Sequence, residues 1–86
     1  MTVYEVLLSK AARKQLDSLP TVIHNKIIED IYRLAEVPRP AGCKKLKGYN
    51  HSYRIRVGDY RIIYEIEDKI LRILVIAIGH RKDIYK

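Results

Sequence analysis

Hydrophobic and polar residues alternate through one stretch of the chain, from Tyr53 to Tyr64. Gly58 and Asp59 interrupt the alternation at its centre, and glycine at the first place of a two-residue loop suits a type II′ hairpin turn. Because side chains alternate between the two faces of a strand, pairing across this turn sets six side chains on one face, and we expect that face to be buried. The three opposed pairs are Val57 with Tyr60, Ile55 with Ile62, and Tyr53 with Tyr64.

The other face of this hairpin is cationic. It carries Arg54 and Arg56 from the first strand and Arg61 from the second, with Arg56 directly opposite Arg61. Like charges directly opposite one another destabilise a sheet, whereas an anion that bridges two guanidinium groups offsets the repulsion. The pattern therefore predicts a phosphate site on this face. The alternative is a pair of solvated arginines on an exposed surface.

The rest of the hydrophobic pattern predicts two helices and two further strands. Residues 2–8 form a β-rich run, and apolar residues at helical spacing predict a helix from Lys10 to Pro20 and a longer one beyond it. After a loop at 41–49, the hairpin is followed by a turn at Asp68 and Lys69 and by a strand at 70–78. A two-residue turn there sets Glu65 opposite Arg72. We expect an α+β fold in which a two-helix hairpin packs on a small twisted, mainly antiparallel four-stranded sheet.

Length and composition limit the class of protein. The 86 residues make a single domain, 1–86, and a composition that is 48% hydrophobic and 31% charged is typical of a globular chain. Cys43 is the only cysteine, so an internal disulfide is excluded and a cytoplasmic location is expected. The longest apolar run, Ile73 to Ile78, is too short to span a bilayer. We expect no membrane association.

Positive charge is concentrated in the middle of the chain. The net charge is +7, yet residues 1–38 carry five basic and five acidic side chains. Residues 39–61 carry seven basic side chains against Asp59 alone, and Lys44, Lys45 and Lys47 lie in the loop that leads into the arginine-bearing strand. Such a concentration indicates a polyanionic partner, nucleic acid above all. An acidic protein partner would give the same pattern.

The C-terminal segment adds a second group of candidate residues. Continued alternation from the strand at 70–78 would place His80 on the face of Arg56 and Arg61, with Arg81 and Tyr85 just beyond it. The three histidines and the single cysteine lack the spacing of metal ligands. We therefore expect chemistry that needs neither a metal nor another cofactor.

These segments resemble the RelE/ParE superfamily of toxin-antitoxin toxins, and most closely its RelE-like mRNA interferase branch. The resemblance spans the whole chain and includes the order strand, helix, helix, three strands, and the Leu19-Pro20 joint. Three segments carry most of it: KKLKG (Lys44 to Gly48), YRIRVGDYRIIYEI (Tyr53 to Ile66) and IGHRKDIY (Ile78 to Tyr85).

The resemblance implies a toxin that enters the ribosomal A site, cuts mRNA there and so inhibits translation. It also implies a cognate RelB-like antitoxin that wraps around the toxin and silences it. The family's catalytic positions fall on Arg61, Arg81 and Tyr85, and its phosphate or ribosomal RNA contacts fall on Lys47, Arg54 and Arg56. Some relatives carry lysines in place of Arg54 and Arg56, one of them a proposed general base. Arginine does not release its proton, so a base at that position is not expected here.

Cleavage of RNA without a metal proceeds by attack of the 2′-hydroxyl on the neighbouring phosphorus, with a 2′,3′-cyclic phosphate as the first product. Arg56 and Arg61 suit stabilisation of the phosphorane charge, because planar guanidinium groups match its oxygens. Tyr85 is the candidate general base, activated by neighbouring cations. Arg81 is expected to assist the leaving 5′-oxygen, with His80 as the competing acid.

Two other classes of function remain open from the sequence. A ParE-like relative on the same fold would inhibit DNA gyrase by binding and would not need Arg61, Arg81 and Tyr85. A non-catalytic nucleic-acid-binding module would explain the basic segment. It would not explain why the C-terminal segment, with Arg81 and Tyr85, follows beside the arginine face.

Overall fold

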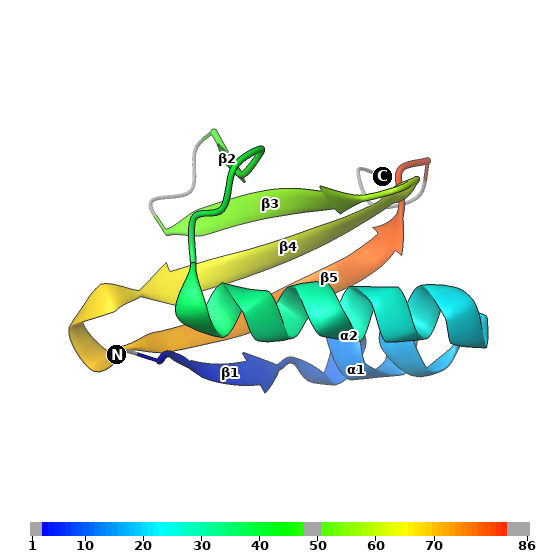
Figure 1. Ribbon diagram of the computed structural model, residues 1–86, viewed down its shortest axis with the longest axis horizontal. Helices are drawn as coiled ribbons and strands as arrows, with labels where there is room; N and C mark the ends of the chain where they lie inside the picture. Colours follow the sequence, from blue (N-terminus) through cyan, green and yellow to red (C-terminus); the bar gives the residue numbers. More distant parts are fainter. Residues whose placement is uncertain (1–2, 48–50, 83–86) are drawn as a thin grey trace.

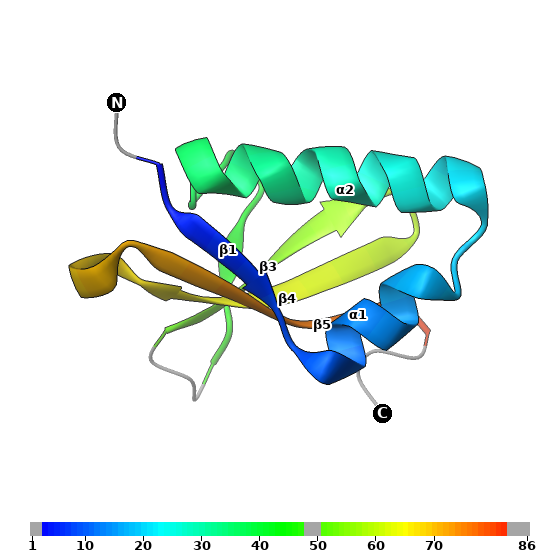
Figure 2. The ribbon, with the colours of Figure 1, turned by 90° about the horizontal axis from the view of Figure 1, so that it is seen from below.

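The structure is a computed structural model that describes residues 3–47 and 51–82 of the chain. Its elements follow in the order β1 (Glu5–Leu8), α1 (Lys10–Asp17), α2 (Thr21–Glu36), β2 (Lys44–Lys45), β3 (Ser52–Val57), β4 (Tyr60–Glu67), a 3₁₀ turn (Asp68–Ile70) and β5 (Arg72–His80). The strands form one sheet in the order β1-β5-β4-β3-β2, in which β1 runs parallel to β5 and the other neighbours are antiparallel. Helix α2 lies across one face of the sheet, and α1 packs against β5 beyond the end of β1 (Figures 1 and 2).

The central hairpin has the register that its alternation predicts. Tyr53 pairs with Tyr64, Ile55 with Ile62, Arg56 with Arg61 and Val57 with Tyr60. Gly58 has φ +60°, and Asp59 is not among the described residues with positive φ, so the turn has the type II′ pattern. The face toward α2 is buried at its aliphatic positions and at Tyr64, while Tyr53 and Tyr60 are half-buried.

A single hydrophobic core lies between this face and the helices. Ser9 caps the N-terminus of helix α1, since its Oγ accepts a hydrogen bond from the Ala12 N–H at 3.0 Å, and α2 follows Pro20 directly. The apolar stripe of each helix faces the sheet because its members recur every three to four residues. The helices contribute Ala12, Leu16, Ile27, Ile31 and Leu34, which pack with Ile55, Ile62, Tyr64, Ile73 and Val75 of the sheet.

The sheet differs from the expected four-stranded one because its described part has five strands, with both parallel and antiparallel pairs. The extra strand, β2, consists of Lys44 and Lys45 alone, which pair with Arg54 and Tyr53. These two lysines lie in a basic segment without apolar alternation, so the sequence indicated a loop there. The parallel pairing of β1 with β5 joins the two ends of the chain, and no local pattern reports such a pairing.

The register between β4 and β5 also differs from the expectation. Four residues, not two, turn the chain, so Arg72 pairs with Glu67 and the expected Glu65–Arg72 pairing is wrong. Arg72 Nε lies 3.2 Å from Glu5 Oε1 of β1. A β-bulge at Ile63/Tyr64 then adds one residue to β5, which exchanges the faces of all later positions of that strand.

Helix α1 supplies hydrogen bonds to β5 where β1 has ended. The Ser9 Oγ donates to the Ile76 carbonyl at 2.8 Å, and the Ile78 N–H donates to Gln15 Oε1 at 2.8 Å. These bonds occupy polar groups on the edge of β5 and hold the strand around its bulge. No helix in the described part of the chain is long and apolar enough to cross a membrane.

Candidate anion-binding site

A cationic hollow of about 290 Å³ lies at the β2 side of the sheet, where β3 and β4 carry their arginines. Because Lys44 pairs with Arg54 and Arg56 pairs with Arg61, these four side chains share the face that turns away from α2. No acidic side chain is among the described residues that line the hollow. The lining residues are Gly42, Lys44, Arg54, Arg56 and Arg61.

Arg61 is less accessible than the sequence suggested. The face opposite the core is expected to be exposed, yet of its three arginines only Arg56 is exposed, and Arg54 and Arg61 are half-buried. The Nε and Nη1 atoms of Arg61 are buried and have no hydrogen-bond partner among the described residues. A buried donor without a partner costs free energy, more so when it is charged. Arg61 therefore lines the hollow with a guanidinium group that has two unsatisfied donors.

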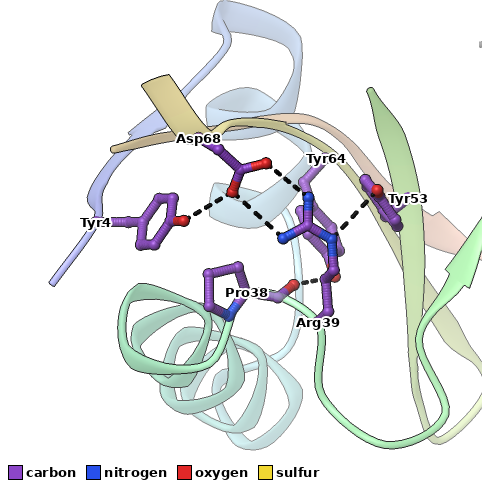
Figure 3. Close-up of polar contacts among 6 residues, drawn as sticks. All are labelled: Tyr4, Pro38, Arg39, Tyr53, Tyr64 and Asp68. Carbon is purple, nitrogen blue, oxygen red and sulfur yellow. Dashed lines mark hydrogen bonds and ion pairs between the residues drawn. The ribbon is translucent and has the colours of Figure 1, made fainter. Parts of the chain in front are cut away.

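A polar cluster fixes the loop that forms one wall of the hollow (Figure 3). Arg39 Nη2 donates to Asp68 Oδ2 at 2.9 Å, and Arg39 Nε donates to the Tyr53 hydroxyl at 3.2 Å. The Tyr4 hydroxyl donates to Asp68 Oδ1 at 2.7 Å. These bonds tie the loop after α2 to β3, to the turn before β5 and to the residue preceding β1.

Tyr64 of β4 holds the same loop, which follows α2, from the side of the hydrophobic core. Its buried hydroxyl donates to the Pro38 carbonyl at 2.8 Å and lies 3.3 Å from Cys43 Sγ, and burial raises the pKa of Tyr64. The loop then turns at Gly42, whose φ of +88° favours glycine. Lys44 follows two residues later, so its place in the hollow depends on this anchored turn.

The Asp68 carboxylate should make stability depend on acid pH. The Arg39 guanidinium and the Tyr4 hydroxyl hold the pKa of Asp68 below its ordinary value. Because the pKa is lower in the folded chain, this stabilisation is present above about pH 4 and is lost as pH falls through the folded-state pKa. Urea unfolding between pH 6 and pH 3 should show a smaller loss of stability for Asp68→Asn than for the parent. Asp17→Asn, an exposed aspartate at the end of α1, serves as the control, and equal pH dependence in Asp68→Asn and the parent would contradict the assignment.

The remaining predicted site residues lie around the hollow or away from it. Lys45 pairs with Tyr53 and therefore lies on the opposite face from Lys44, and Lys47 is exposed beyond β2. The Arg81 N–H donates to the Asp59 carbonyl at 2.7 Å, and its Nε lies 3.7 Å from Asp59 Oδ1. Arg61 pairs with Gly79, so Arg81 lies two residues further along the chain than the partner of Arg61.

His80 does not share the face of Arg61, so that prediction is wrong. It pairs with Tyr60, and the two rings meet edge to face with centroids 5.4 Å apart. The bulge in β5 explains the error, because the extra residue shifts the alternation by one position. His80 is thereby removed as the acid for chemistry in the hollow. Tyr85 lies outside the described residues.

Sequence reasoning missed the residues that build the wall of the hollow. Arg39 and Asp68 are 29 positions apart, and no local pattern links them. Gly42 did carry a signal, since glycine after Pro40 and Ala41 is typical of a turn with positive φ. Within residues 3–47 and 51–82, no group of three or more His, Cys, Asp or Glu side chains is arranged to hold a metal ion.

Comparisons with known proteins agree with this architecture. A family model described as the ParE toxin of the type II toxin-antitoxin system parDE matches residues 6–85. Toxin RelE3 of Methanocaldococcus jannaschii is 36% identical over 85 residues, covering 94% of both chains. Toxin RelG of Mycobacterium tuberculosis is 29% identical over 84 residues, covering 96% of this chain and 97% of RelG.

Solved structures show the same fold. The toxin in the RelE–RelB complex of Pyrococcus horikoshii has a TM-score of 0.83 at 33% identity, covering 96% of this chain and 99% of that one. The RelBE2 toxin-antitoxin complex of Mycobacterium tuberculosis gives a TM-score of 0.83 at 28% identity, covering 96% and 97%. With a family match along nearly its whole length and RelE-type toxins among its relatives, the chain belongs to the ParE/RelE family of type II toxins.

Proposed function

We propose that this toxin is a ribosome-dependent, metal-independent mRNA endonuclease, and that the cationic hollow binds the phosphate at the cleaved bond. One observation carries the proposal: Arg61 keeps two buried guanidinium donors without a partner among the described residues, and its side chain lines a hollow together with Gly42, Lys44, Arg54 and Arg56. A protein gains nothing in stability from such an arrangement. A phosphate that accepts hydrogen bonds from these donors offsets both the repulsion between the arginines and the cost of burying unpaired donors.

The proposed reaction breaks one bond of the RNA backbone. The 2′-oxygen forms a bond to phosphorus as its proton passes to a base, the bond from phosphorus to the 5′-oxygen breaks, and that oxygen takes a proton from water. Arg61 and Arg56 stabilise the charge of the phosphorane, since they face one another across the ladder. We assign Arg81 to hydrogen-bond the leaving oxygen, since its long, half-exposed ion pair with Asp59 can be exchanged for that contact. The role of Tyr85 as base rests on the sequence alone.

The proposed function is tested by inducing the toxin in cells and mapping the 5′ ends of mRNA against the reading frame. A ribosome-dependent nuclease should give new ends at a fixed position within codons of translated messages. Ends that ignore the reading frame, or no new ends during growth arrest, would contradict the proposal.

A ParE-like inhibitor of DNA gyrase is the second candidate, and one observation favours it: the matching family model is described as a ParE toxin. Relatives named RelE and RelG favour the nuclease instead. Supercoiling of a plasmid by purified gyrase separates the two functions. A nuclease leaves supercoiling unchanged at toxin concentrations that arrest translation in an extract. A gyrase inhibitor blocks supercoiling at concentrations that leave translation unchanged.

A cognate antitoxin is the partner that we propose beside the ribosome and mRNA. The relatives from P. horikoshii and M. tuberculosis were solved as complexes with RelB-type antitoxins. An exposed cationic hollow also suits an acidic protein that competes with RNA. Purification of the tagged toxin from its own cells should recover a small partner, and a toxin tolerated at high expression without one would count against the proposal.

The basic side chains of the hollow should govern how ribosome binding depends on salt. Replacing Lys44 and Arg54 together by alanine removes two phosphate contacts, which should reduce the slope of log affinity against log salt by about 1.4. The matched control replaces Lys10 and Arg13, two exposed cations of α1 outside the hollow. Binding titrations at several salt concentrations decide the matter, and equal slopes for the two double variants would refute the contacts.

A further inference from the structure

A second hollow, of about 240 Å³, lies on the other side of the β3 edge from the cationic one. Its floor is apolar, formed by Leu34 of α2 and Ile55 of β3, and Pro40 and Ala41 add apolar atoms at its wall. Asp30 and Arg33 of α2 and Arg56 of β3 supply its charged groups. The volume falls just below the range of pockets for drug-sized ligands, so a single planar ring system is the occupant that it suits.

The two hollows adjoin at the edge of β3. Gly42 and Arg56 line both of them. The edge is open between them because β2 pairs only with Tyr53 and Arg54, and no described strand pairs with Ile55, Arg56 or Val57 on that side. A nucleic acid strand whose phosphate occupies the cationic hollow can therefore place a neighbouring base in the second one.

The second hollow differs from the cationic one in holding a carboxylate, that of Asp30, beside its two arginines. The Asp30 side chain is 23% exposed, and its Oδ1 lies 3.4 Å from Arg33 Nη1, which leaves Oδ2 without a partner in the described part of the chain. A carboxylate repels a phosphate but accepts hydrogen bonds from the N–H groups of a base edge. Arg33 is 77% exposed at the rim, where its guanidinium plane can stack on a base.

We infer that this hollow is a nucleobase subsite, and that Asp30 selects guanine in it. Guanine presents two adjacent donors, N1–H and the N2 amino group, which match the two oxygens of a carboxylate, whereas uracil presents a single N–H. The subsite would make cleavage depend on the base beside the cleaved phosphate. This inference rests on the proposed function and adds a specificity-determining residue to it.

The inference is tested with messages that carry guanine or inosine at each position of the A-site codon, since inosine lacks only the N2 amino group. Single-turnover cleavage by the parent toxin should be roughly tenfold to a hundredfold faster for guanine at one position, as expected for the loss of one hydrogen bond to a charged group. Asp30→Asn should cut the two messages at similar rates. Glu29→Gln, an equal change of charge at an exposed neighbouring position on α2, should keep the preference of the parent.

Two results would overturn the subsite. One is equal cleavage of the guanine and inosine messages by the parent toxin at every position. The other is a preference that Asp30→Asn leaves intact; a loss of antitoxin affinity in the same variant would then assign the hollow to a protein segment.

Failure of the proposed function gives a different result, because the parent would then cut no message on the ribosome. Binding of short guanine- or inosine-containing RNAs, measured by fluorescence anisotropy at low salt, still tests the subsite in that case. A guanine preference that depends on Asp30 supports it, and equal affinities refute it.

Discussion

Replacement of Arg61 by alanine should slow cleavage about a hundredfold to a thousandfold while ribosome binding changes little. Arg61 lines the cationic hollow and keeps two unsatisfied donors, and removing one donor from a developing anionic charge costs roughly 3 to 4 kcal/mol of transition-state stabilisation. Single-turnover cleavage on programmed ribosomes measures the rate directly. Growth arrest should weaken in parallel.

Arg13→Ala on α1 is the control for this prediction, because it removes an exposed arginine outside the hollow. Its cleavage rate should equal that of the parent. If Arg61→Ala binds the ribosome normally and also cuts at the parent rate, Arg61 has no part in catalysis, and inhibition by binding alone becomes the better account. Arg81→Ala and Tyr85→Phe extend the same assay to the leaving oxygen and to the proposed base.

Replacement of Arg61 by methionine should make the free toxin more stable, by about 1 kcal/mol. Methionine keeps an unbranched chain of similar length but removes the unpartnered buried donors and the repulsion with Arg56. Most substitutions destabilise a protein, so a gain at a half-buried position is a specific expectation. Urea unfolding of the antitoxin-free toxin at neutral pH measures it.

Arg56→Met provides the comparison, since it also relieves the repulsion but removes an exposed side chain. It should raise stability by less than Arg61→Met does. A toxin that loses stability on Arg61→Met would show that the guanidinium group is satisfied in the folded chain. Arg61 would then need no anion to satisfy its donors.

The parts of the fold that the sequence predicts are those that local pattern determines. The hairpin from Tyr53 to Tyr64 has strict alternation around a glycine turn, and its register is as expected. Each helix has a start signal in the sequence: Ser9 caps α1 with its side chain, and Pro20 precedes α2. Strand β2 was not predicted because two lysines show no alternation of apolar and polar residues. The parallel pairing of β1 with β5 was not predicted because the paired residues are more than 60 positions apart.

The site was predicted where it follows from the hairpin and missed where it depends on distant contacts. Arg54, Arg56 and Arg61 share a face because side chains alternate along strands. His80 was misplaced because a bulge near Ile76 leaves no mark in an apolar run. Burial of the Arg61 donors, the Arg39–Asp68 contact and the Asp30 hollow all require tertiary structure, and no periodicity reports them.

The central claim is that the toxin cuts RNA by 2′-hydroxyl attack at a phosphate held in the cationic hollow. It is tested most directly by single-turnover reactions on ribosomes that carry either an all-ribose message or one with a single 2′-deoxy sugar at the attacking position. The account predicts that the all-ribose message is cut to a 2′,3′-cyclic phosphate and a 5′-hydroxyl, and that the 2′-deoxy message is not cut at that position. Equal cleavage of both messages, or growth arrest by a toxin that cuts neither, would contradict it.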